Sequence, residues 1–300
     1  MKKHILITIL ILSSYSKLFS QELYIISHPA ANLAKNRIEV RNNVLSYGGF
    51  KYFHNSFELN YGITGNLTDY NSVFYTTQAG YKFLGNYEGA LRYRFFSYDK
   101  QNYHLRAAWQ GAVTIPINST EIVSGKVTYE LHPGHVVSFY NFANDITVPI
   151  TDFHTTDNLV FKNDLILTNL IKRFSVTTEM GYNITSPKSD FKFGNYFDWT
   201  LAMGYFAFPV HQKSYDQPTV NFYSEWKAYY FQKNKFLGTD VRNSGGFRLN
   251  TYFGVQTILF SSLMVEASYM LPVHSNEFTE EFIGKRPTQF LISLRYLFFL

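Results

Sequence analysis

Apolar and polar residues alternate along most of the chain in segments of about ten residues, and turn-forming residues separate these segments. The segment 103–115 shows the pattern clearly. One set of positions is Tyr103, Leu105, Ala107, Trp109, Gly111, Val113 and Ile115, and the other is His104, Arg106, Ala108, Gln110, Ala112 and Thr114. Successive side chains of a β-strand point to opposite faces, so each segment predicts a strand with one apolar and one polar face. The ranges 198–207 and 220–229 alternate in the same way.

The alternation predicts fourteen strands, an even number as bacterial single-chain barrels require. Their ranges are 37–47, 56–63, 67–79, 88–98, 103–114, 122–131, 135–145, 158–170, 174–183, 198–208, 218–229, 246–258, 262–272 and 288–299. Short connections are expected at 64–66, 99–102, 132–134, 171–173 and 259–262, and long ones at 146–157, 184–197, 230–245 and 273–287. A twelve-strand barrel with a loop hairpin in 116–157 is the alternative count.

Alternation alone does not separate a membrane barrel from a soluble sandwich, because both have one buried apolar face. The chain contains 24 Tyr, 29 Phe and 3 Trp, and aromatic residues make up 19% of it, while the mean hydropathy is only −0.15. After the N-terminal region no run of about 18 apolar residues could form a membrane-spanning helix. Only helices and closed barrels satisfy every backbone group in hydrocarbon. We therefore predict an all-β protein, a transmembrane antiparallel β-barrel.

The N-terminal sequence predicts that the protein is exported. Met1–His4 is basic, the run Ile5–Leu12 is apolar, and Ser20 is a small residue at a suitable distance for cleavage. Residues 1–20 are therefore expected to be a cleaved signal peptide, and 21–300 the barrel domain. A retained anchor helix would need about 20 apolar residues, but serines and Lys17 interrupt this run. With the first strand expected at residue 37, the mature chain leaves no obvious plug.

The C-terminal sequence indicates the membrane in which the protein is located. One face of the last strand carries Phe290, Ile292, Leu294, Tyr296, Phe298 and Leu300. An amphipathic terminal strand that closes on aromatic residues resembles the signal by which the barrel-assembly machinery recognises outer-membrane proteins, although Leu300 stands where Phe is usual. We expect a bacterial outer-membrane protein whose partners are this machinery and the outer-membrane lipids.

Several short segments resemble one family of barrels. They are the turn YGITGNL at 61–67, the strand EGALRYRFF at 88–96, the turn LIKRFSV at 170–176 with MGY at 180–182, and the closing hairpin from Gly254 to Phe298. Together they are similar to the outer-membrane β-barrels of the MetA pathway of phenol degradation. The resemblance implies a porin-like transporter for small molecules, including hydrophobic or aromatic ones, and offers no catalytic residues to carry over.

Charge and cysteine content exclude several other functions. The formal net charge is +5, but Lys2, Lys3 and Lys17 leave with the signal peptide and the mature chain keeps 24 basic and 22 acidic residues. No nucleic-acid partner is expected, because a basic footprint is missing. The chain has no cysteine, which excludes disulfides, thiol nucleophiles, cysteine metal sites and a lipid anchor on cysteine.

The polar face of each strand should line the lumen. The predicted pore-lining residues are Arg92, Arg94, His104, Arg106, Glu225, Lys227, Arg248, Glu266 and Arg295. Charges of this kind can select small polar or anionic solutes, as charged rings do in pores. Alternatively, arginines and glutamates pair with one another and fill the lumen, as side chains do in small barrels. Both interpretations stay open at this point.

No constellation of residues predicts catalysis, a cofactor or a metal. His274-Ser275-Asn276 superficially resembles the outer-membrane phospholipases, but the spacing differs and these residues lie in a predicted loop. His132 and His135 flank a Pro-Gly turn and supply two ligands, fewer than the four of a structural zinc site. We therefore expect no enzyme.

Amphipathic aromatic rings favour the membrane interface. The candidates for lipid-facing or girdle positions are Tyr87, Tyr93, Trp109, Tyr140, Tyr205 and Trp226, and the loop tyrosines Tyr215, Tyr229 and Tyr230 could stack on sugars. The leading functional hypothesis is a porin-like channel or passive transporter for a small-molecule solute. A lipid-modifying barrel enzyme and a closed structural or adhesive barrel are the alternatives.

Overall fold

The computed structural model describes most of the chain after the predicted signal peptide, which lies outside the described residues. The described residues are 24, 26–47, 52–78, 81–117, 121–123, 126–132, 135–140, 159–187, 190–210, 214, 217–240, 244–276 and 288–299. Their regular structure consists of strands, numbered β1 to β18 along the chain. Within these residues, no helix has the length and apolar character needed to cross a membrane.

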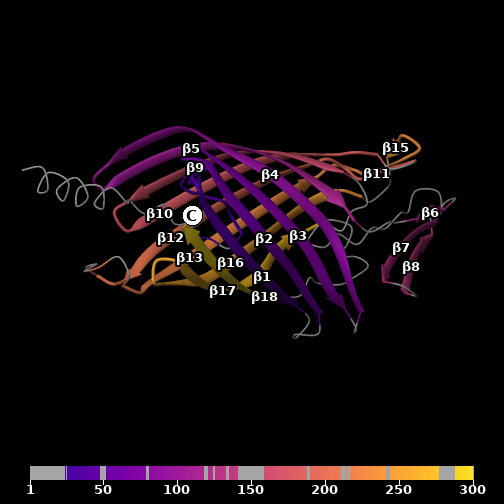
Figure 1. Cartoon of the computed structure of the whole chain (residues 1–300). Coiled ribbons are helices and arrows are strands. Elements are labelled where there is room, and N and C mark those ends of the chain that lie inside the picture. Colours follow the sequence, from indigo (N-terminus) through magenta and orange to yellow (C-terminus); the bar gives the residue numbers. More distant parts are fainter. Residues whose placement is uncertain are drawn as a thin grey trace, which may run out of the picture.

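Twelve antiparallel strands close into a barrel (Figure 1). They are β1 (Arg37–Tyr47), β2 (Tyr52–Thr64), β3 (Leu67–Gln78), β4 (Tyr81–Lys100), β5 (Tyr103–Pro116), β9 (Val160–Ile171), β10 (Phe174–Thr185), β12 (Tyr196–Phe208), β13 (Thr219–Phe231), β16 (Gly246–Leu259), β17 (Leu263–Ser275) and β18 (Gln289–Phe299). The first and last strands close the barrel, pairing from Arg37 opposite Phe299 to Tyr47 opposite Gln289. Closure leaves no sheet edge without a partner.

The barrel fold is confirmed, and the strand count is the alternative one, twelve instead of fourteen. The predicted strands 122–131 and 135–145 are not in the wall, because β5 pairs directly with β9 from Tyr103 opposite Ile171 to Thr114 opposite Val160. The intervening segment forms a separate sheet of β6 (Glu121–Val123), β7 (Lys126–His132) and β8 (His135–Tyr140). Apolar and polar residues alternate in any two-faced β-hairpin, so the alternation does not show whether a hairpin belongs to the barrel wall.

Four of the five predicted short connections join wall strands at one end of the barrel, and the fifth, at 132–134, falls instead between β7 and β8. Two-residue connections at 65–66, 101–102 and 172–173 and a three-residue connection at 260–262 lie at this end, where β1 also begins and β18 ends. The connection between β12 and β13 at this end is longer. At the opposite end, a small sheet of β11 (Phe191–Lys192), β14 (Lys235–Phe236) and β15 (Thr239–Asp240) lies in two of the long connections.

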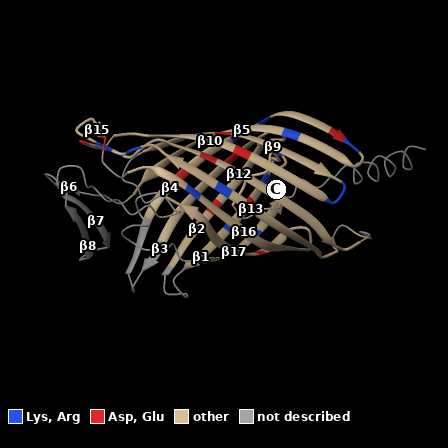
Figure 2. Cartoon of the chain, turned by 180° about the vertical axis from the view of Figure 1, so that it is seen from behind, with Lys and Arg blue, Asp and Glu red and all other residues tan. Residues whose placement is uncertain are grey.

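The barrel is apolar outside and polar inside, the reverse of a water-soluble sandwich. On β10, Met180, Tyr182 and Ile184 are exposed, while Glu179 and Asn183, at positions of the opposite parity, are buried in the interior. Figure 2 shows few charged positions along the strands of the wall. The predicted lipid-facing aromatics Tyr93, Trp109 and Tyr205 are exposed, whereas the side chain of Tyr140 lies outside the described part. An apolar outer band and a polar interior are typical of a transmembrane barrel.

A charge on the outer face should therefore destabilise the barrel in lipid. Leu165 lies near the middle of β9 and is 53% exposed. We expect Leu165→Arg to lower the free energy of unfolding by about 2–4 kcal/mol, because the guanidinium would sit in hydrocarbon near the bilayer midplane. Urea unfolding of the protein refolded into vesicles measures this change.

The matched control is Phe260→Arg, at a turn residue that is 70% exposed at the short-turn end. It should cost less than about 1 kcal/mol, because charges near the interface are tolerated. Equal stability of the two variants would contradict a lipid-facing surface around Leu165.

Candidate luminal site

The chain before β1 runs through the inside of the barrel. We call Tyr24 and residues 26–34 the N-terminal segment. Tyr24, Ala30, Ala31 and Leu33 in it are buried. The prediction that the mature chain leaves no plug is therefore wrong. Ten residues in an extended conformation reach about 30 Å, enough to cross the lumen without forming a strand of the wall.

Two carboxylates of the wall hold three consecutive residues of this segment. The backbone N–H groups of Ile26 and Ser27 donate to the two oxygens of Glu225 on β13, with N–O distances of 3.2 and 2.6 Å. The N–H of His28 donates to Glu179 on β10 at 3.2 Å. Hydrogen bonds to charged groups typically contribute about 1.5–3 kcal/mol. These bonds also provide partners for carboxylates that are buried in the wall.

Neutral hydroxyls of the wall hold the part of the segment nearer to β1. The N–H of Ala30 donates to Oγ1 of Thr168 on β9 at 2.8 Å, and the N–H of Leu33 donates to Oγ1 of Thr68 on β3 at 3.0 Å. Arg92 on β4 also contacts this part, donating to the carbonyls of Pro29 and Ala31 at 3.1 and 3.2 Å. The wall thus supplies side-chain partners for a backbone that has no strand beside it.

Tyr24 anchors the far end of the segment. Its hydroxyl lies 2.6 Å from Oγ of Ser175 on β10, and its carbonyl accepts from Arg41 on β1 and Arg295 on β18 at 3.4 and 3.5 Å. Its ring meets Tyr223 edge-on, with 6.2 Å between centroids. The partners of the whole segment come from β1, β3, β4, β9, β10, β13 and β18, so the segment crosses the barrel interior.

Ion pairs stabilise the seam where the barrel closes. Arg41 and Arg295 are opposite each other in the β1–β18 register, which by itself would be repulsive. Glu266 lies 3.4 Å from both guanidinium groups, and Glu58 and Glu39 add contacts of 3.8 and 3.7 Å to Arg41 and Arg295 respectively. Interleaved acids therefore neutralise two buried arginines.

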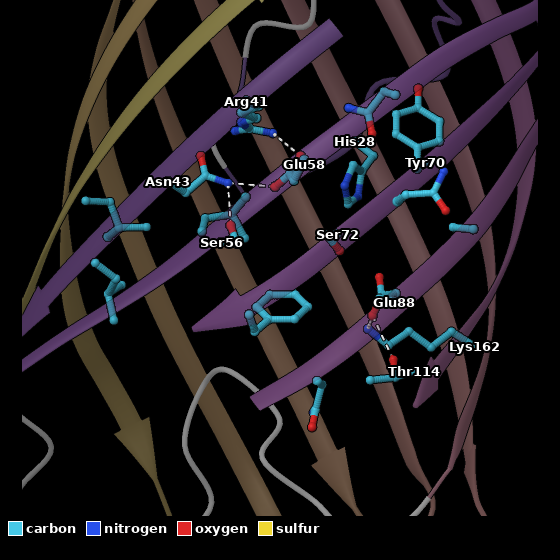
Figure 3. A pocket seen from close by; sticks show the side chains of 18 of the residues that line it. His28, Arg41, Asn43, Ser56, Glu58, Tyr70, Ser72, Glu88, Thr114 and Lys162 are labelled. Atoms are coloured by element: carbon cyan, nitrogen blue, oxygen red, sulfur yellow. Dashed lines mark hydrogen bonds and ion pairs between the residues drawn. The ribbon is translucent and has the colours of Figure 1, made fainter. Parts of the chain in front are cut away.

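A cavity of about 190 Å³ lies in the lumen against the N-terminal segment (Figure 3). Arg41 and Glu58 lie on one side of it, Glu88 and Lys162 form an ion pair on the other, and His28 of the segment also lines it. A solute in this cavity would meet both signs of charge.

A second cavity of about 60 Å³ is more acidic. Asp164, Glu179 and Asp198, on β9, β10 and β12, place carboxylate oxygens within 4.8 Å of one another. Gly181 lies between the two aspartates in the register, and a side chain there would collide with both. Lys227 lies 4.0 Å from Asp198 and partly balances the charge. Oxygen ligands of this kind suit a hard cation.

The structure buries five of the predicted pore-lining residues completely. Arg92 contacts the N-terminal segment, Glu225 holds it, and Glu266 and Arg295 belong to the ion pairs of the seam. The guanidinium of Arg248 stacks over aromatic rings of β13, at 4.3 Å from one ring centroid. These five side chains fill the interior, as the second of our two interpretations describes.

The other four predicted residues divide between the rim and the cavities. Arg94 donates to the carbonyl of the turn residue Gly65 at 2.8 Å. His104 and Arg106 contact Asp99 near the short-turn end, at 2.7 and 3.2 Å. Lys227 alone among the nine lines the larger cavity.

Most residues that line the cavities were not among the predicted pore-lining residues. Arg41, Glu58, Glu88 and Lys162 all occupy polar positions of strands that were predicted wholly or in part, so their parity could have identified them. The acidic group could not be found by spacing, because its three members come from three strands. Of the three tyrosines predicted for loops, Tyr229 lines both cavities, Tyr230 is exposed and Tyr215 lies outside the described residues. The predicted loop residues His274 and Ser275 instead end β17.

The fold is shared with a solved structure. An outer-membrane channel from Pseudomonas putida F1 is 10% identical to this chain, with a TM-score of 0.57, and the match covers 91% of this chain and 99% of that chain. The NanC porin is 10% identical with a TM-score of 0.47, covering 86% and 98% of the two chains. No family model and no curated protein sequence matches this chain. The likeness concerns the fold, and the resemblance to the phenol-degradation family stays a prediction.

Loss of Glu266 should weaken the barrel seam. We expect Glu266→Gln to lower the free energy of unfolding by about 3 kcal/mol, because removal of one partner from a buried ion pair leaves the arginines poorly compensated. Unfolding in vesicles, followed by the gel migration of unheated samples, measures the change.

Glu58→Gln is the matched control, because its side chain is 19% exposed and contacts Arg41 at the longer distance of 3.8 Å. It should cost about 1 kcal/mol or less. Equal losses of unfolding free energy in the two variants would show that burial of Glu266 does not make its ion pairs more important for stability.

Proposed function

We propose that this protein is a porin-like outer-membrane channel or passive transporter for small solutes. The observation that carries the proposal is a closed barrel with an apolar outer face and a polar lumen that contains cavities. A closed barrel is one of the two structures that satisfy the backbone in lipid. A polar interior is typical of barrels whose lumen carries water and solutes.

We further propose how the protein reaches and sits in its membrane. A cleaved signal peptide at 1–20 would export it, and the C-terminal strand, which pairs with β1 to close the barrel, would present the assembly signal. Short turns of bacterial barrels face the periplasm. The end where β1 begins, and where the N-terminal segment enters the lumen, would therefore be periplasmic.

We propose that the charged residues of the cavity lining favour charged or polar solutes, although apolar side chains such as Leu45, Phe74 and Leu291 also line the larger cavity. Glu58 and Glu88 line the larger cavity, and the acidic group of Asp164, Glu179 and Asp198 lines the smaller one. These carboxylates outnumber the lysines and the arginine of the same walls, so we propose a weak preference for cations. The earlier hypothesis of anion selection rested on arginines that the structure places in contact with the N-terminal segment and the turns.

One observation favours a second candidate, a closed structural barrel. The N-terminal segment and the five buried side chains occupy much of the lumen. Single-channel recording in a planar bilayer distinguishes the two. Discrete current steps support the channel, and a folded, heat-modifiable barrel without steps supports the closed scaffold.

A cavity lysine should influence ion selectivity. We expect Lys227→Gln to raise the ratio of cation to anion permeability by about twofold or more, because it removes a positive charge beside the acidic group. The reversal potential in a salt gradient measures this ratio.

Lys172→Gln is the control, since Lys172 is an exposed turn residue whose charge salt screens within about 10 Å. Its reversal potential should equal that of the parent. A Lys227→Gln pore with unchanged selectivity would show that ions do not pass the cavities.

A further inference from the structure

We propose that the N-terminal segment is a releasable plug that closes the lumen at rest, and that Glu225 and Glu179 are the wall residues that hold it. This inference rests on the proposed channel function. It assigns to the inner wall a binding site whose ligand is an extended stretch of the same chain.

The segment is attached in a way that allows release. The described strand pairs of the wall include none of its residues, so it can leave without breaking a ladder between strands. Most of its hydrogen bonds run between its backbone and side chains of the wall. The side chains of Tyr24, His28 and Asn32 add further contacts to the wall. Each of these hydrogen bonds can be replaced by a hydrogen bond to water in the open state.

A pivot lies between the segment and β1. Asn36 has a φ of 62°, a left-handed conformation that asparagine adopts more readily than most residues. Its N–H donates to the carbonyl of Gly62 at 2.8 Å, which fixes this residue to β2. A side chain at Gly62 would collide with the carbonyl of Ala34, so a glycine is needed for the close approach. Motion of the segment would therefore involve the residues on the N-terminal side of Ala34.

The two carboxylates differ from the other acceptors of the site, because a carboxylate can carry a negative charge and a hydroxyl does not. They accept from residues 26, 27 and 28 in succession, at the part of the segment far from the pivot. The contacts nearer the pivot are made by threonine hydroxyls and by Arg92. Recognition of backbone N–H groups requires acceptors on the wall but no particular side chain on the segment.

The position of Glu179 links the plug to the solute path. Its carboxylate lies in the acidic group that lines the smaller cavity, and His28 reaches both cavities. The ring of His28 lies 3.7 Å from Glu179 in addition to the backbone contact. A segment seated on Glu179 therefore lies beside both cavities, on the path that a solute would take.

The first test weakens the two contacts in the full-length chain. We expect Glu179→Gln combined with Glu225→Gln to raise the open fraction of single channels at least about tenfold, because neutral acceptors bind N–H groups more weakly than carboxylates. Asp99→Asn is the matched carboxylate-to-amide control, since Asp99 contacts His104 and Arg106 near the short-turn end. It should gate like the parent.

The second test locks the segment in place and does not depend on the folding of the first variant. The N–H of Ala30 reaches Oγ1 of Thr168 at 2.8 Å, a proximity suited to a disulfide, which needs Cα atoms about 4.4–6.8 Å apart. The chain has no cysteine, so Ala30→Cys with Thr168→Cys gives a single thiol pair. We expect the oxidised form to stay closed and reduction to restore the openings of the parent.

The outcomes separate the two proposals. If the parent conducts and neither the glutamine variant nor the oxidised lock changes gating, the plug is overturned and the channel remains. If neither the parent nor the glutamine variant conducts in a folded, heat-modifiable state, the channel function itself fails. Openings that rise in the glutamine variant and disappear in the oxidised lock establish the plug.

Discussion

Pairing of the first strand of the barrel with the last is the constraint on which the rest of the structure depends. A bilayer offers no water to an unpaired N–H or C=O, so a sheet in lipid must close on itself. Once β1 pairs with β18, every wall strand has two neighbours and each side chain is assigned to lipid or to lumen by its parity. The alternation in the sequence is the direct consequence of this closure.

Closure of the barrel also brings polar side chains together in the interior, where they need hydrogen-bond or ion-pair partners. Twelve strands with inward polar faces place arginines and carboxylates close together, and Arg41 and Arg295 meet at the seam itself. Glu266 between them resolves the repulsion locally. Elsewhere Glu88 pairs with Lys162 and Asp198 with Lys227, while Glu225 and Glu179 accept hydrogen bonds from backbone N–H groups of the N-terminal segment. The N-terminal segment thus satisfies part of the wall, and the wall satisfies the segment.

The wall strands were predictable from the sequence because lipid enforces a strict period of two on every one of them. The predicted range 37–47 coincides with β1, and most other ends differ by a few residues, with larger differences at β2 and β4. The hairpin of β7 and β8 was assigned wrongly to the wall, since periodicity reports two faces and not which sheet contains them. Direct pairing of β5 with β9 depends on partners far apart in sequence.

The luminal site was less predictable, for a physical reason that concerns the N-terminal segment. Its residues 26–34 carry no alternation, because most of their hydrogen bonds to the wall are made by backbone atoms, which every residue has. Only the wall shows that the segment binds there, through buried inward carboxylates such as Glu225. Parity correctly placed Glu225 and Arg92 inside but could not distinguish a residue that lines water from one that holds a peptide.

The same attachment explains why the segment can be both ordered and separable. A thirteenth strand in the wall would share ladder hydrogen bonds on both sides and could not leave without opening the barrel. A segment held by side chains exchanges its partners for water, and each hydrogen bond then changes the free energy by only about 1–3 kcal/mol. Few such bonds are needed to keep a segment seated, and few need to be lost to release it. A lumen lined by carboxylate and hydroxyl acceptors therefore supports a plug that is seated at rest and can leave without opening the wall.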